Sequence, residues 1–128
     1  MTKPLVVIPG VERPLSFSAL TVALYEDGED KPFMKFFSGL VNEVRESGHF
    51  NLTAVARLAY YGVVSTYQQH SEAPPNDVTV LRILEILLEQ DNFDLVTKIV
   101  NSMAEALPRA KNAESPKEET TEPELGQK

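Results

Sequence analysis

The sequence predicts a mainly α-helical fold: a bundle of four to five helices with a short N-terminal β-hairpin or strand and a disordered C-terminal tail. Three observations support this prediction. Between residues 30 and 107, most apolar side chains recur every three or four residues, as in amphipathic helices. Prolines, glycines and asparagines divide that stretch into segments of helix length. Residues 109–128 contain a single large apolar side chain, Leu125, which is too little to form a core.

The N-terminal segment predicts a hairpin followed by a short helix. Residues 5–8 have the β-branched content of a strand, the Pro-Gly pair at 9–10 provides a turn, and residues 15–18 alternate like a returning strand. Residues 19–25 fit either a continued strand or a short helix, and we favour the helix. Residues 26–30, with the sequence EDGED, are expected to form a charged turn.

A longer helix is predicted from Asp30 to Gly48. Asp30 can cap its start, Pro32 fits the first turn, where no amide donor is needed, and Gly48 can end it. Its apolar face carries three aromatic side chains: Phe33, Phe36 and Phe37. Such rings belong either to the core or to a groove that binds a partner, and the pattern alone leaves both alternatives open.

The next helix is expected from about residue 52 to residue 67, behind an Asn51 cap, with a loop over residues 68–76. Its face includes three small residues, which permit a neighbouring helix to approach closely: Ala56, Ala59 and Gly62. The last helix is expected to begin behind the capping pair Asp91 and Asp94 and to end at Pro108.

The helix predicted near residues 78–90 is apolar around most of its circumference, and only a strip containing Arg82, Glu85 and Glu89 is polar. A helix of this kind is buried, either by its own chain or by a partner. Because a domain of this size buries only ~60–70% of its surface, we treat this helix as a candidate interface. The candidate partner-binding residues of the chain are Phe33, Phe36, Phe37, Val80, Leu84, Leu87 and Leu88.

Length and charge restrict the function classes. The 128 residues predict one domain, here residues 1–108, followed by a disordered tail over residues 109–128. Five of the 19 acidic and four of the 12 basic residues lie in that tail, so residues 1–108 hold −6 of the net charge of −7. This balance argues against a nucleic-acid groove, because phosphate binding needs clustered cations. With no Cys, disulfides, thiol nucleophiles and zinc–thiolate sites are excluded.

The motifs for catalysis and metal binding are weak. His49 and His70 have no second ligand at metal spacing, and EDGED lacks the spacing of a calcium loop. Glu85 and Glu89 share a helix face with Arg82, which is more typical of surface ion pairs than of an acid–base pair. A small hydrolase or metal protein is therefore disfavoured, and we expect no enzyme activity, no cofactor and no metal. No apolar run is long enough for a signal-peptide core or a membrane span, so a soluble cytosolic protein is expected.

The order of elements resembles a known family, the small tail assembly chaperones of long-tailed, siphovirus-type bacteriophages. The resemblance covers about residues 15–108 plus the tail. The segments that carry it are LSFS at 15–18, ALTVALY at 19–25, the helix ending at Gly48, LTAVARLAYYG at 52–62, VLRILEILLE at 80–89 leading to Phe93, MAEAL at 103–107 and the polar tail.

The resemblance implies a mainly helical, non-catalytic protein that acts in the bacterial host cytoplasm and is absent from the mature virion. Members of the family coat the hydrophobic tape measure protein before the tail tube forms around it. Many are made in a second, longer form by a programmed ribosomal frameshift, and the extension is thought to recruit tail tube protein. The tail of this chain would then link to such an extension. As a chaperone, the chain is expected to bind stoichiometrically and to form a homo-oligomer. The alternative function, from a different class, is a small helical adaptor or regulator that homo-oligomerises through its apolar helix.

Overall fold

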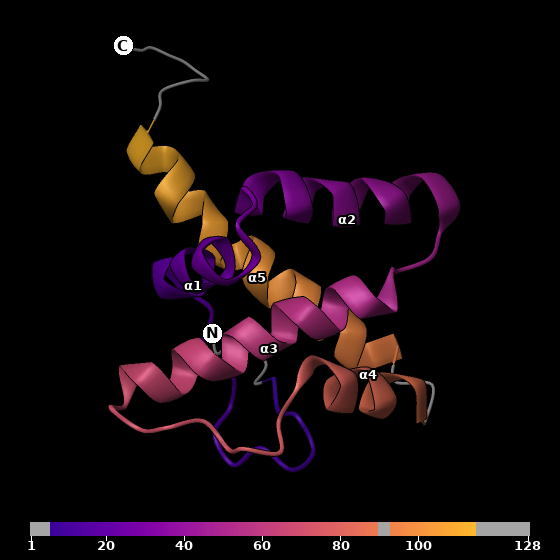
Figure 1. Cartoon of the computed structure of the whole chain (residues 1–128). Helices are drawn as coiled ribbons and strands as arrows, with labels where there is room; N and C mark the ends of the chain where they lie inside the picture. The colour runs from indigo at the N-terminus through magenta and orange to yellow at the C-terminus, as the bar shows by residue number, and fades with distance from the viewer. Residues whose placement is uncertain (1–5, 90–92, 115–128) are drawn as a thin grey trace, which may run out of the picture.

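The computed structural model describes residues 6–89 and 93–114, and over these ranges the chain forms five α-helices and no β-strand. In chain order the helices are α1 (Ala19–Glu29), α2 (Phe33–Ser47), α3 (Leu52–Gln69), α4 (Val80–Glu89) and α5 (Phe93–Glu114). Helix α3 lies at the centre and contacts α1, α4 and α5, while α2 contacts α1 (Figure 1). The mainly helical prediction is therefore confirmed. None of the described helices is long and apolar enough to cross a membrane.

The predicted N-terminal hairpin is wrong. Residues 6–18 have no regular secondary structure, and a single backbone hydrogen bond, from the Leu15 N–H to the Val6 carbonyl at 2.9 Å, joins the two arms. Pro9 and Pro14 have no N–H to donate, so a strand ladder cannot continue through them. The β-branched residues that suggested a strand serve instead to fill the core.

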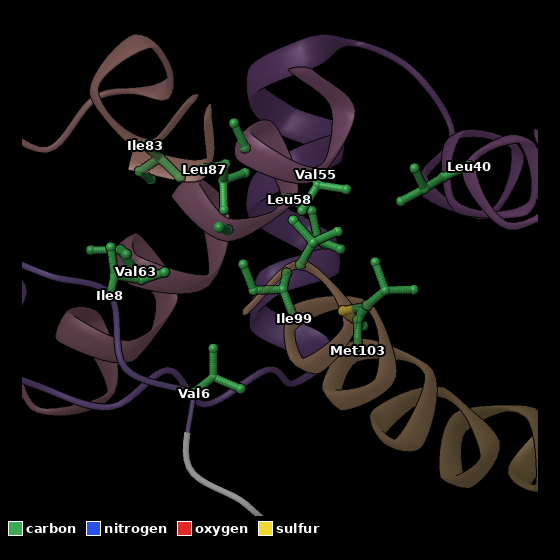
Figure 2. Close-up of a cluster of buried hydrophobic side chains, with 14 of the residues drawn as sticks. Val6, Ile8, Leu40, Val55, Leu58, Val63, Ile83, Leu87, Ile99 and Met103 are labelled. Carbon is green, nitrogen blue, oxygen red and sulfur yellow. The ribbon is translucent and has the colours of Figure 1, made fainter. Parts of the chain in front are cut away.

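This irregular segment, which we call the N-terminal strap (residues 6–17), packs onto the helices through its side chains. Ile8 and Val6 are almost fully buried, and Ile8 lies beside Val63 of α3 in Figure 2. At the other end of the strap, the Phe17 ring lies directly against Gly62 of α3. The small face of α3 therefore admits an aromatic ring at Gly62 rather than a neighbouring helix.

Helix α1 confirms the helical alternative for residues 19–25 and extends beyond it. Ser18 caps its start: the Ser18 hydroxyl accepts from the Leu20 N–H at 3.2 Å, and the Thr21 hydroxyl accepts from the Ser18 N–H at 3.0 Å. The predicted charged turn at residues 26–30 is wrong, because α1 continues through Glu29. Asp30 ends the helix in the left-handed conformation, with φ 57°.

The N-cap of α2 lies two residues after Asp30, the residue that the sequence predicted for this position. The N-cap is Pro32, which offers no side-chain oxygen, and Asp30 belongs to the end of α1. The carboxylate of Glu26 fills the missing role by accepting from the Phe33 N–H at 2.9 Å. A negative charge at this end also complements the helix dipole. The predicted end at Gly48, φ 79°, is confirmed.

Helix α3 forms the centre of the core. Its predicted cap is confirmed, since the Asn51 side chain accepts from the Ala54 N–H at 3.1 Å. Leu58 is fully buried and lies among side chains of α4 and α5, such as Leu87 and Ile99 (Figure 2). Helix α3 is therefore covered by three other helices: α1, α4 and α5.

Helix α5 does not end at Pro108, as the sequence predicted, but continues to Glu114. A proline inside a helix removes one N–H donor and crowds the carbonyl four residues earlier, at a cost of about 3 kcal/mol, but a kink accommodates this without ending the helix. The predicted cap Asp91 and residues 115–128 of the predicted disordered tail lie outside the described residues. The expected pairing of the last two helices agrees with contacts between α4 and α5.

Adding a methyl group at Gly62 tests the contact between the strap and α3. A Cβ at this position would lie 2.5 Å from a Phe17 ring carbon. We expect Gly62→Ala to lower the free energy of unfolding by about 1–2 kcal/mol in urea denaturation, because overpacking outweighs the better helix propensity of alanine. Gly39→Ala in α2 is the matched control, because a Cβ there meets nothing within 4 Å. It should raise stability by up to about 1 kcal/mol. Equal effects of the two changes would contradict the close strap contact.

Candidate partner-binding surface

The aromatic residues proposed for partner binding lie mainly in the interior. Phe33 is fully buried and Phe37 is 5% exposed, so in this conformation neither offers a surface to a partner. Phe36 is partly buried and stacks on Tyr25 of α1, with 4.5 Å between ring centroids. Tyr25 also meets Phe33 edge to face at 5.4 Å. The rings therefore join α1 to α2, which favours the core alternative for this group.

Helix α4 divides its apolar circumference between two faces. The inner face is buried by the rest of the chain and consists of Ile83, Ile86 and Leu87. On the opposite side Leu81 is 66% and Leu88 is 61% exposed. Val80 and Leu84 are partly buried and lie between the two faces. Of the predicted α4 residues, Leu87 is thus a core residue, whereas Leu88 is available to a partner.

We call Leu81, Leu84 and Leu88 the outer stripe. Leu81 was not among the predicted site residues, although its seven-residue spacing from Leu88 places both on one line of a helix. Phe93, 62% exposed at the start of α5, was also missed. Its ring lies 5.9 Å from that of Phe50, and most of its surface is exposed. Exposed leucines two turns apart are the strongest feature of this surface.

Charged groups border the outer stripe on one side. Arg82 and Glu85 form an ion pair of 3.5 Å, and their side chains are 54% and 56% exposed. Glu89 is exposed one turn further along. Pairs this exposed contribute little to folding stability, so these groups remain available to a partner.

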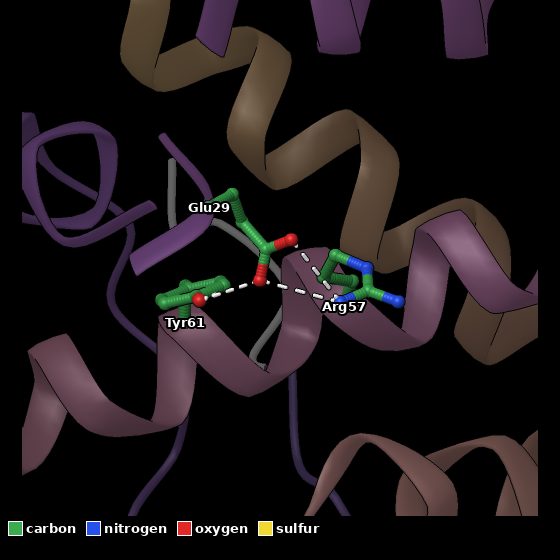
Figure 3. Close-up of polar contacts among 3 residues, drawn as sticks. All are labelled: Glu29, Arg57 and Tyr61. Carbon is green, nitrogen blue, oxygen red and sulfur yellow. Dashed lines mark hydrogen bonds and ion pairs between the residues drawn. The ribbon is translucent and has the colours of Figure 1, made fainter. Parts of the chain in front are cut away.

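A polar cluster joins α1 to α3 and is the clearest candidate for chemistry (Figure 3). The Tyr61 hydroxyl donates to a Glu29 carboxylate oxygen at 2.7 Å, and Arg57 donates to the same carboxylate at 3.2 and 3.3 Å. The Tyr61 hydrogen bond holds the pKa of Glu29 below its ordinary value, and burial raises the pKa of Tyr61 to about 12. A general acid or base needs a pKa near the working pH. Both pKa values move away from neutrality, so this cluster acts as a structural link.

Removing the Tyr61 hydroxyl tests that link. Tyr61→Phe should lower the free energy of unfolding by about 1–2 kcal/mol at neutral pH, because a charged hydrogen bond is lost. The folded-state pKa of Glu29 is depressed, so its stabilisation is complete above the ordinary value of 4.5 and disappears as the pH falls through the folded pKa. The difference in free energy of unfolding between wild type and Tyr61→Phe should therefore decrease as the pH falls through the folded-state pKa of Glu29, as measured by urea titrations. A difference independent of pH would contradict the role of Glu29.

A small cleft lies between the strap and the start of α4, lined among others by Gly10, Asp77 and Arg82. Its volume of about 60 Å³ compares with the ~300–1,000 Å³ of typical ligand pockets, so it accommodates water but not a metabolite. Within the described ranges no three His, Asp or Glu side chains gather in a geometry that could hold a metal ion. His49 and His70 are both exposed.

Compared with protein-family models, with curated proteins and with solved structures, the chain shows no match.

Proposed function

We propose that this chain is a non-enzymatic phage tail assembly chaperone, which binds the tape measure protein in the bacterial host cytoplasm and keeps it soluble during tail assembly. The observation that carries the proposal is the exposure of Leu81 and Leu88 on a helix whose opposite face is already buried. An apolar helical client can lay its own apolar face along such a stripe. Binding in this mode needs no catalytic group.

The charge of the chain supports the same role. A protein that exposes large apolar side chains tends to associate nonspecifically, and a net charge far from zero counteracts this. The chain has a net charge of −7, of which −6 lies in residues 1–108. Most of the negative charge thus lies in residues 1–108, the same part of the chain that carries the exposed stripe.

Co-expression with the tape measure protein of the same phage genome tests the proposal. Wild-type chain should keep the tape measure protein soluble and purify with it. Leu88→Glu should abolish both effects, because a charge in the stripe would be buried without a partner. Met34→Glu is the matched control: Met34 is also an exposed apolar residue, 48% exposed, but lies on α2. An insoluble tape measure protein with wild-type chain would contradict the function. Loss of binding with Met34→Glu alone would instead place the client on α2.

The longer form belongs to the same proposal and has a separate test. A slippery heptamer near the 3′ end of the gene, followed by an overlapping reading frame, would support the frameshifted extension that contacts tail tube protein. If the gene has neither, that extension is absent from this protein, and tape measure binding by the present chain still stands or falls by co-expression.

A further inference from the structure

We infer that, in the absence of a client, α4 pairs in antiparallel orientation with α4 of a second copy of this chain, through the outer stripe and about a two-fold axis near residues 84 and 85. The exposure of Leu81 and Leu88 and the distribution of charge on α4 carry this inference. The dimer itself does not depend on the proposed function. Its role rests on that function, because such a dimer would cover the client-binding face until a client replaces the second copy.

The outer stripe has two flanks of different chemistry. Successive residues of an α-helix are rotated by about 100°, so Leu81 and Leu88 lie nearly in line, two turns apart. On one side of this line lie three charged residues: Arg82, Glu85 and Glu89. On the other side lie the apolar and partly buried Val80 and Leu84. Figure 1 shows α4 at the periphery of the molecule, so a second helix has access to it.

The two flanks select the orientation of a symmetric helix pair. In a parallel pair, the two-fold axis runs along the helices and brings the charged flank of each copy against the apolar flank of the other. In an antiparallel pair, the axis runs across the helices and each flank meets its own equivalent. The charged side chains then face one another, and Leu84 faces Leu84 of the second copy. Only the antiparallel arrangement avoids placing charges against apolar side chains.

A register that places Leu81 opposite Leu88 of the second copy also orders the charges. With a rise of about 1.5 Å per residue, Arg82 then lies between Glu85 and Glu89 of the second copy, offset from each by about 3 Å along the axis. Each arginine is thus surrounded by carboxylates of both copies. The single unfavourable contact is between the two Glu85 side chains beside the axis. Arg82→Glu should therefore weaken the dimer, because it replaces the cation between these carboxylates by a further negative charge.

Cysteine cross-linking of the full chain tests both the dimer and its register, because the sequence has no cysteine of its own. Glu85→Cys should form a disulfide-linked dimer under mild oxidation, since residue 85 lies beside its equivalent across the axis. Leu81→Cys and Leu88→Cys chains should cross-link when mixed and far less when each is alone. Ser38→Cys is the control, because Ser38 is exposed on α2, outside the proposed contact. Its disulfide yield therefore measures random collisions between chains. Circular dichroism of each variant verifies that it is folded, and light scattering gives the mass of the wild-type chain.

Three results would overturn the inference. The first is a wild-type chain that scatters as a monomer, and the second is a Glu85→Cys yield no higher than that of Ser38→Cys. The third is efficient cross-linking of Leu81→Cys and Leu88→Cys each with itself, which would indicate a parallel pair. Adding an apolar helical peptide of the tape measure protein should lower the Glu85→Cys yield. A yield unchanged by the peptide would overturn the covering role and leave the dimer standing, so failure of the proposed function is distinguishable from failure of the dimer.

Discussion

Phe33→Ala should lower the free energy of unfolding by about 3–5 kcal/mol, as large-to-small changes of buried aromatic residues do. Phe33 is fully buried, and its ring contacts those of Tyr25 and Phe37 at centroid distances of 5.4 and 5.8 Å. Its N–H also anchors the Glu26 carboxylate that caps α2. The alanine variant keeps that amide, so the loss measures ring packing alone. Urea denaturation followed by circular dichroism gives the free energy.

Phe93→Ala is the matched control for this change. Phe93 is 62% exposed and contacts one ring, that of Phe50. Its truncation should therefore cost at most about 1 kcal/mol. If Phe33→Ala left stability unchanged and abolished binding of a client, the aromatic residues of α2 would form the partner groove that the sequence left open. A large loss with Phe33 and a small loss with Phe93 would assign the first to the core and the second to the surface.

The helices were predictable where their signals are local. Gly48 marks the end of α2 and Asn51 marks the start of α3. Both act on amides and carbonyls within a few residues of themselves. The start of α1 had an equally local signal, Ser18 followed by Thr21, whose side chains form the capping box. That pair could have separated the helix from the supposed strand before it.

The strap was not predictable in the same way, because its conformation depends on distant residues. Val6 and Ile8 have the β propensity of a strand, yet what holds them is burial beside residues of other elements, such as Val63. Pro9 and Pro14 indicated that a ladder would be interrupted, and this signal should have outweighed the propensity. Tertiary packing decided the outcome where the local patterns conflicted.

The candidate surface was half predictable for a related reason. The pattern of α4 indicated more apolar side chain than the chain would bury, but a helix that is apolar nearly all round does not reveal which side faces inward. The placement of α3 decides this, by covering Ile83 and Leu87 and leaving Leu81 and Leu88 exposed. The predicted list accordingly contained both the buried Leu87 and the exposed Leu88.

Replacing these two neighbouring leucines separately by glutamate should give opposite results. Leu87 is 2% exposed, so Leu87→Glu places a carboxylate in the core without a partner and should lower the free energy of unfolding by about 3–5 kcal/mol or unfold the chain. Leu88 is 61% exposed, so Leu88→Glu should change stability by no more than about 0.5 kcal/mol. Thermal and urea denaturation of both variants measure this contrast.

Binding should separate the two positions further. Leu88→Glu keeps the fold but removes an apolar group from one end of the outer stripe, and in the antiparallel dimer both copies lose it. At about 1.5–3 kcal/mol for each leucine, self-association should weaken by about 100-fold or more, as measured by analytical ultracentrifugation. A folded Leu88→Glu chain that still dimerises and still binds the tape measure protein would contradict the placement of both contacts on the outer stripe of α4. A chain that loses the dimer but retains the client would place the client elsewhere, because the leucine that one partner needs would then be dispensable for the other.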